Sequence, residues 1–150
     1  MIPAQIEKEM LIEAPVEVVW RIVTEADQIS QWFSAEAQLD LRVGGQGRLG
    51  TGRKSYPIQV EAIDPPRRFA FRWLYPEGAR AERGNSTLVE FTLSQEAGNT
   101  RLRVVESGFD QTDWSDEEKV RSIEDHSRGW EECFARLRQL ALSQPEARRG

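Results

Sequence analysis

The chain has 150 residues, a formal net charge of −5 and a single cysteine. A chain of this length fits one domain and buries about 68–70% of its unfolded surface, so it needs no cross-links to hold a core. The negative charge argues against binding nucleic acid or an anionic membrane through a basic field. One cysteine excludes an internal disulfide, and no apolar stretch reaches the ~18 residues of a membrane span.

The N-terminal segment carries acidic residues where a signal peptide would carry a basic and then an apolar run. We therefore expect a cytoplasmic protein with one domain over residues 1–150. Its core is predicted to extend from about 6 to 142, and the tail 143–150 is predicted to be frayed.

The first elements are a strand and two short helices. The segment 6–12 alternates between apolar and polar residues, as a half-buried strand does. Pro15 is typical of the first turn of a helix, and apolar residues follow it at helical spacing. The segment 24–27 resembles a capping box and predicts a second short helix, which ends near Trp32 and Phe33.

Beyond the second helix, the polarity pattern has a period of two. Predicted strands cover residues 36–41, 48–51, 58–62, 69–73, 89–93 and 102–104. Turn residues separate most of them at 43–47, 64–67 and 97–99, and a long polar loop is predicted at 75–85. With the first strand, these segments predict an antiparallel meander of six or seven strands, with one apolar face and one solvated face.

The longest helical signal begins at a capping box, Ser115 to Glu118, and ends at Gln144 and Pro145. Its apolar stripe recurs every three or four residues, at Val120, Ile123, Ser127, Trp130, Phe134, Leu137 and Ala141. A helix of roughly 26 residues is about 39 Å long. The apolar face of the meander is the one surface large enough to cover it, and such a sheet can curl around a helix. We therefore predict an α+β helix-grip fold, in which a curved antiparallel sheet surrounds a long C-terminal helix.

Sequence motifs in the same order resemble a known superfamily. They are Ile12–Trp20, Trp32-Phe33, Arg42–Gly45, Ile63–Arg68, Phe71–Trp73, Leu88–Leu93, Thr100–Leu102, Glu106–Phe109 and Gly129-Trp130. The chain resembles the SRPBCC (START-like) superfamily, and within it proteins similar to the C-terminal domain of the activator of the 90-kDa heat-shock protein ATPase. The resemblance implies a helix-grip fold and a pocket between the sheet and the long helix, suited to a lipid or another hydrophobic ligand.

Candidate ligand-binding residues follow from this expected pocket and from the aromatic side chains that face it. They are Trp32, Phe33, Phe71, Trp73, Phe91, Val104, Phe109, Ile123, His126, Ser127, Trp130 and Phe134. The aromatic rings have two interpretations, as solid core or as the lining of a cavity. His126 and Ser127 interrupt the apolar stripe and are either a polar anchor for a ligand or residues on the flank of the helix.

The sequence assigns no catalytic residue, metal site or cofactor. With one histidine and one cysteine, a zinc site is not expected, and no serine lies in a nucleophile elbow. Cys133 follows two acidic residues, which disfavour a thiolate, and is interpreted as a core residue. Gly129 lies inside the long helix, where glycine costs roughly 1 kcal/mol relative to alanine. Either a close approach of another element requires it, or it is tolerated.

Three functions remain open from the sequence. The leading hypothesis is the binding of a small apolar or amphipathic molecule, without catalysis. The alternatives are a protein-interaction module, co-chaperone-like by analogy with the family, and an enzyme such as a cyclase or hydrolase of a hydrophobic substrate. An enzyme would require a buried titratable group facing the pocket, for which His126 is the candidate.

Overall fold

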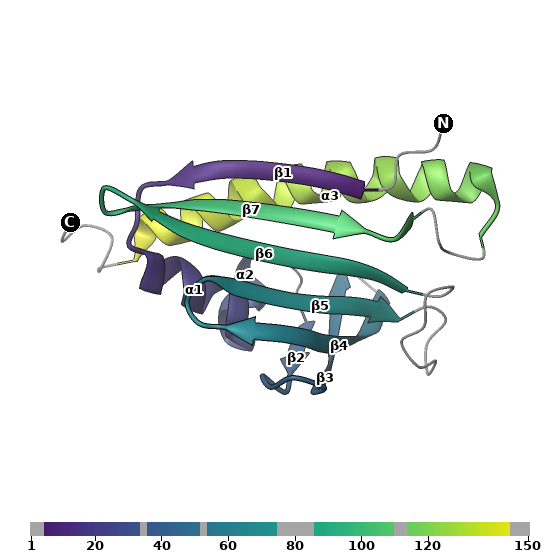
Figure 1. The fold of residues 1–150 in the computed structure, drawn as a ribbon, viewed down its shortest axis with the longest axis horizontal. Coiled ribbons are helices and arrows are strands. Elements are labelled where there is room, and N and C mark those ends of the chain that lie inside the picture. Colours follow the sequence, from purple (N-terminus) through teal and green to yellow (C-terminus); the bar gives the residue numbers. More distant parts are fainter. Residues whose placement is uncertain (1–4, 34–35, 52–53, 75–85, 110–113, 145–150) are drawn as a thin grey trace.

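A computed structural model describes residues 5–33, 36–51, 54–74, 86–109 and 114–144 (Figure 1). The elements are β1 (Gln5–Ile12), α1 (Val16–Thr24), α2 (Ala26–Trp32), β2 (Glu36–Leu39), β3 (Gln46–Thr51), β4 (Lys54–Asp64), β5 (Arg68–Leu74), β6 (Ser86–Glu96), β7 (Asn99–Ser107) and α3 (Asp116–Ser143). This order confirms the predicted sequence of strand, two short helices, strands and long helix. The predicted loop at 75–85 lies outside the described residues.

The strands form one seven-stranded antiparallel sheet in the order β1-β7-β6-β5-β4-β3-β2. Strands β2 to β7 are consecutive neighbours, and β1 completes the sheet by pairing with β7, where Met10 lies opposite Leu102. Figure 1 shows α3 running alongside β1, with the three helices behind the sheet in this view. The arrangement is the predicted α+β helix-grip fold.

Strand β7 shows why one face of the sheet is the core. Its residues alternate between partly and fully buried along the whole strand. Leu102, Val104 and Glu106 are each 0% exposed and face the helices. Arg101 and Arg103 flank Leu102 in sequence and therefore face the opposite side. The apolar inner positions and the buried faces of the helices form one hydrophobic cluster.

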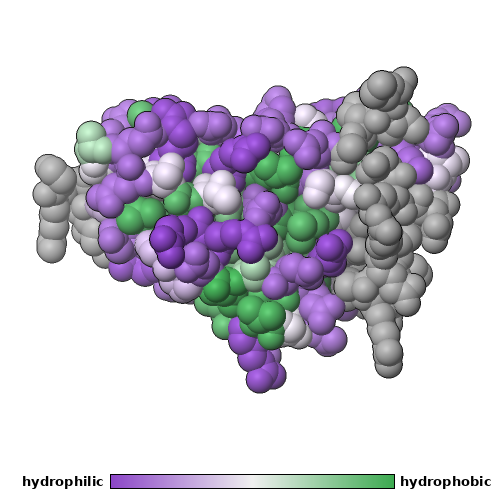
Figure 2. Space-filling model, in the orientation of Figure 1, coloured by the Kyte–Doolittle hydropathy of each residue, from purple (hydrophilic) through white to green (hydrophobic). Residues whose placement is uncertain are grey.

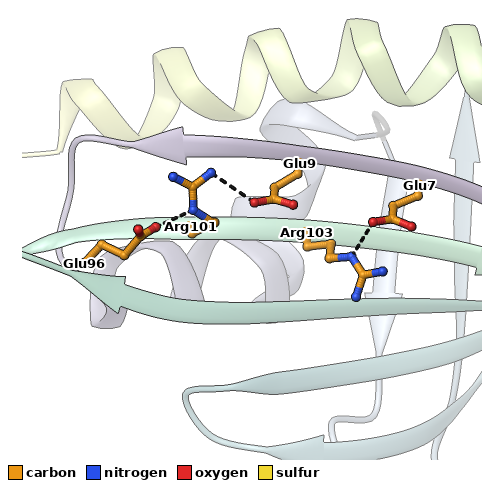
Figure 3. Close-up of polar contacts among 5 residues, drawn as sticks. All are labelled: Glu7, Glu9, Glu96, Arg101 and Arg103. Atoms are coloured by element: carbon orange, nitrogen blue, oxygen red, sulfur yellow. Dashed lines mark hydrogen bonds and ion pairs between the residues drawn. The ribbon is translucent and has the colours of Figure 1, made fainter.

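The outer face of the sheet carries charged pairs across β1, β7 and β6 (Figure 3). The Arg103 guanidinium donates to Glu7 at 2.8 Å, and Arg101 donates to Glu9 at 3.0 Å and also to Glu96. The hydrogen bond from Arg103 lowers the pKa of the Glu7 carboxyl. Exposed pairs of this kind contribute little to stability, but they make this part of the face strongly polar.

Hydrophobic side chains are interspersed with hydrophilic ones over the outer face in Figure 2. Among the described residues, the exposed large apolar side chains are Leu11, Leu41, Val43 and Val120. Leu11 alone among these four lies on β1, in line with the outward-facing Glu7 and Glu9. The described part of this face therefore offers no broad apolar surface over β1 and β7.

Helix α3 begins as the sequence predicts, since the Ser115 hydroxyl oxygen accepts a hydrogen bond from the Glu118 N–H at 3.2 Å. The second short helix does not begin as expected. Thr24 belongs to α1, and its hydroxyl donates back to the Trp20 carbonyl at 2.7 Å. The residue that precedes α2 is Glu25, whose side chain makes no capping bond. A hydroxyl in the last turn of a helix can satisfy a carbonyl of its own helix, and here that local bond prevails over the capping box.

For Gly129, the structure favours the second of the two interpretations, that the glycine is tolerated. A Cβ placed on Gly129 would meet no atom within 4 Å, so no close approach of the sheet or of Trp32 and Phe33 requires a glycine there. The position does mark a change along α3. Every buried residue of the helix lies after it, at Trp130, Cys133, Phe134, Leu137 and Ala141.

Candidate functional site

A continuous cluster of aromatic rings covers the inner face of the sheet. The ring of Trp130 lies 5.3 Å from that of Phe33 and 5.7 Å from that of Phe91, measured between centroids. Phe33 also stacks on Trp73, with centroids 5.9 Å apart and ring planes 25° apart. Further ring contacts extend the cluster to Trp32, Phe69, Phe71 and Phe134.

The space left inside this cluster is small. One apolar cavity leaves about 10 Å³ for the centre of a water-sized molecule, and it is lined by Val23, Ile29, Trp32, Phe33, Leu39, Leu49, Ile58, Phe69, Phe71 and Phe91. That space holds about one water molecule at most. Ligand pockets commonly have roughly 300–1,000 Å³. Around this cavity, the rings therefore pack mainly against one another.

Glu106 is the one charged side chain among the fully buried residues that the structure describes. Its carboxylate accepts hydrogen bonds from the Thr87 hydroxyl at 2.7 Å and from the Trp130 indole N–H at 3.0 Å. Nδ1 of His126 lies 2.9 Å from both of its oxygens. Three donors around one carboxylate suit its ionised form, which only accepts hydrogen bonds. An unpaired buried charge would be very costly, and these donors offset much of that cost.

His126 is held between this carboxylate and the ring of Phe109, whose centroid lies 5.7 Å from that of the imidazole in an edge-to-face contact. Burial disfavours the charged imidazolium. The charge of Glu106, its hydrogen bond and the charge of Asp125 outweigh burial, so the pKa of His126 is raised above 6.5. The side chain nevertheless remains 26% exposed, so it is only partly shielded from solvent.

Trp130 connects the polar group to the aromatic cluster, because its ring contacts Phe33 and Phe91 while its N–H binds Glu106. Trp130 directly follows the N-terminal half of α3, Asp116 to Gly129, in which no residue is fully buried. The site is thus an aromatic wall beside a fixed polar group, under the less tightly packed half of the long helix.

The candidate ligand residues fall into three groups. Trp32, Phe33, Phe71 and Phe91 line the small cavity. Trp73, Trp130 and Phe134 extend the ring cluster around it. The others lie toward the polar group: Val104 precedes Glu106 on the inner face, Phe109 contacts His126, and Ile123 and Ser127 are partly exposed on α3. The structure brings the first two groups together, and the small cavity is lined by members of the first group but by none of the other two.

Sequence reasoning missed Glu106 and Thr87 as members of the site. From the sequence, Glu106 appears only as part of a family motif. The signal was present, because Glu106 continues the apolar phase of β7 after Leu102 and Val104. Thr87 likewise shares the inward phase of Val89 on β6. A charged residue at an inward position of a strand is a direct indication of a buried polar site.

Other chemistry is not indicated by the residues that the structure describes. They contain no group of three or more His, Cys, Asp or Glu side chains placed to hold a metal ion. Cys133 is buried, and burial raises the pKa of its thiol despite the nearby Arg136 guanidinium, so the reactive thiolate is disfavoured. None of the helices in the described part is both long and apolar enough to cross a membrane.

The fold and site together define a helix-grip, START-like domain with a buried carboxylate under its long helix. Residues 13–141 match the family model described as activator of Hsp90 ATPase homolog 1-like protein. The chain belongs to this family. No curated protein matches the sequence closely enough to extend the comparison.

Solved structures support the same fold. A protein of Bacillus halodurans, BH1534, is 28% identical with a TM-score of 0.74, covering 94% of this chain and 99% of its own. CalU16 from Micromonospora echinospora is 26% identical with a TM-score of 0.70, covering 97% of this chain and 79% of its own. The Aha1 dimer from Colwellia psychrerythraea is 16% identical with a TM-score of 0.76, covering 93% of this chain and 96% of its own, and supports the fold alone.

Proposed function

We propose that this protein binds a small apolar or amphipathic molecule between the inner face of the sheet and the N-terminal half of α3, without catalysing a reaction. The observation that carries the proposal is the junction at Trp130. There a fully buried carboxylate with three donors adjoins an aromatic wall. Binding sites for small molecules combine an apolar lining with a few fixed polar groups in this way.

The packing of α3 supports this location. The side chains around the small cavity pack tightly, so a ligand can enter only if one of the surrounding elements moves. The N-terminal half of α3 moves at lower cost than the C-terminal half, because it buries no residue fully. Phe33 is the partly exposed ring of the aromatic cluster, and Ile123 and His126 are also partly exposed. These side chains mark where an incoming molecule would first meet the site.

The compartment is part of the same proposal. We place the binding activity in the cytoplasm, because the chain has one cysteine and no possible internal disulfide.

The test is a fluorescence titration with N-phenyl-1-naphthylamine (NPN), an uncharged apolar probe. We expect saturable binding by the wild-type protein. Ser127→Phe places a ring on the helix face that carries Trp130, and should weaken NPN binding. Arg128→Phe adds the same ring one residue later, at a side chain that is 69% exposed, and should leave binding unchanged. If NPN does not bind saturably, or if both variants bind as the wild type does, the proposed site is wrong.

A second candidate is a protein-interaction module, and it is favoured by the nearly filled cavity. A shallow hollow of about 480 Å³ lies between α2 and α3 and is lined by Gln31, Ala135, Arg136, Gln139, Leu140 and Ser143. The Colwellia neighbour is described as a dimer. Sedimentation equilibrium tests self-association of this chain. A concentration-dependent mass that Leu140→Arg abolishes, in a protein that binds no NPN, would favour this candidate over ligand binding.

A further inference from the structure

Within the described part of the chain, one ring nitrogen of the polar group under α3 has no hydrogen-bond partner. Nδ1 of His126 is engaged by Glu106, which fixes the ring orientation and leaves Nε2 on the other edge of the ring. Among the residues that the structure describes, none forms a hydrogen bond with Nε2. The side chain is 26% exposed, so it is not closed off from solvent.

Glu106 itself has little capacity left for a ligand. It already accepts from Thr87, Trp130 and His126, so a ligand donor would have to displace one of them. The group that a ligand can use is therefore Nε2. A protonated imidazole carries a hydrogen on each nitrogen, so Nε2–H is a donor and its partner is an acceptor.

The charges around His126 favour this protonated form. Glu106 faces the imidazole from β7, and Asp125 precedes it on α3, 3.9 Å from the Arg128 guanidinium. The uncharged ring of Phe109 also contacts the imidazole. Burial opposes protonation, but the two carboxylates outweigh it and raise the pKa of His126. The hydrogen on Nε2 is therefore retained to higher pH than in a free histidine.

We propose that Nε2–H of His126 binds the acidic head group of an amphipathic carboxylic acid, whose apolar body lies against the rings of Phe33 and Trp130. This inference rests on the proposed ligand-binding function and names the class of ligand. A carboxylate is the favoured acceptor because hydrogen bonds between two charged groups are shorter and stronger than neutral ones. Glu106 acts as a positioning residue, since it orients the imidazole without contacting the ligand.

The experiment displaces bound NPN with decanoate or with 1-decanol, which share a chain length and differ in the charge of the head group. The matched variant is His126→Asn. Its amide N–H₂ can replace Nδ1–H as the donor to Glu106, while the position of Nε2 becomes empty. We expect His126→Asn to weaken decanoate about tenfold. NPN and 1-decanol should each weaken by less than decanoate does, since neither forms a charge-assisted bond with Nε2.

The pH dependence gives an independent readout. In the wild-type protein, the affinity for decanoate should fall as the pH rises through the pKa of His126, and in His126→Asn it should not. Because His126 is the only histidine, its NMR signals report its titration directly. Bound decanoate should raise the pKa of His126 further, and 1-decanol should not.

The outcomes separate this inference from the proposed function. If NPN and 1-decanol bind but decanoate is unaffected by His126→Asn, the ligand class is wrong and the binding function stands. If the wild-type protein binds none of the three, both are overturned.

Discussion

Nδ1 of His126 on α3 lies 2.9 Å from both carboxylate oxygens of Glu106 on β7. The contact ties the N-terminal half of the long helix to the inner face of the sheet. Glu106 also accepts from Trp130, so two residues of α3 one turn apart hold the same carboxylate. The pair therefore couples the position of α3 on the sheet to the protonation of His126. Several measurements can test this coupling.

The first prediction concerns the titration of His126. Since Glu106 supplies the charge and the hydrogen bond that raise the pKa of His126, Glu106→Gln should lower that pKa. Burial, which disfavours the imidazolium, would then be opposed mainly by Asp125. The measurement is an NMR titration of the single histidine. An unchanged pKa in the variant would mean that the contact does not persist in solution.

The second prediction concerns stability and pH. A histidine whose pKa is raised in the folded protein contributes stability that is fully present below its unfolded pKa of about 6.5 and is lost as the pH rises through the folded value. The difference in unfolding free energy between the wild type and His126→Asn should therefore shrink above pH 6.5. Urea unfolding at several pH values measures it. A difference that grows with pH would contradict the raised pKa.

The third prediction compares two tryptophans. The Trp130 N–H binds the Glu106 carboxylate at 3.0 Å, and the Trp32 N–H binds the Ile22 carbonyl at 2.8 Å. Replacing either by phenylalanine removes similar volume from the core. Hydrogen bonds to charged groups contribute about 1.5–3 kcal/mol and neutral ones about 0.5–1.5 kcal/mol. Trp130→Phe should thus be the more destabilising in chemical denaturation. Equal losses of unfolding free energy in the two variants would indicate that Glu106 finds a replacement donor, such as water.

The fourth prediction uses the open space at Gly129. A Cβ there meets nothing within 4 Å, so Gly129→Ala should stabilise the protein by about 1 kcal/mol through helix propensity. Ala135→Gly, at an exposed position of the same helix, is the matched reverse change and should destabilise by a similar amount. Thermal unfolding of both variants tests this. If Gly129→Ala proves destabilising while Ala135→Gly behaves as expected, α3 is not a regular helix at Gly129 in solution.

Much of the fold could be predicted because it depends on local patterns. The period of two in 36–104 indicates strands, and the stripe after Ser115 indicates a helix that begins at that residue, as the structure confirms. A local sequence pattern can also predict the wrong hydrogen bond. At Thr24, the side chain had two possible backbone partners, and the pattern of residues alone did not show that it would bond to Trp20.

The candidate site was predicted less completely. Aromatic residues at inward positions were recognised, and His126 was noted as a possible anchor. Its partner was not, because Glu106 is separated from it by 20 residues and meets it only when α3 packs on the sheet. Whether the rings would leave a large cavity could not be predicted either. Cavity volume depends on how side chains from different elements fit together.

The sequence by itself therefore determined which residues face inward, including the single carboxylate of β7, since strand periodicity is set by neighbouring residues. Only the tertiary structure decided what that carboxylate meets. Thr87 comes from the adjacent strand, and Trp130 and His126 come from a helix 20 or more residues further along the chain. A buried charge is stabilised only by donors at hydrogen-bonding distance, and those distances exist only once the sheet and α3 have packed together.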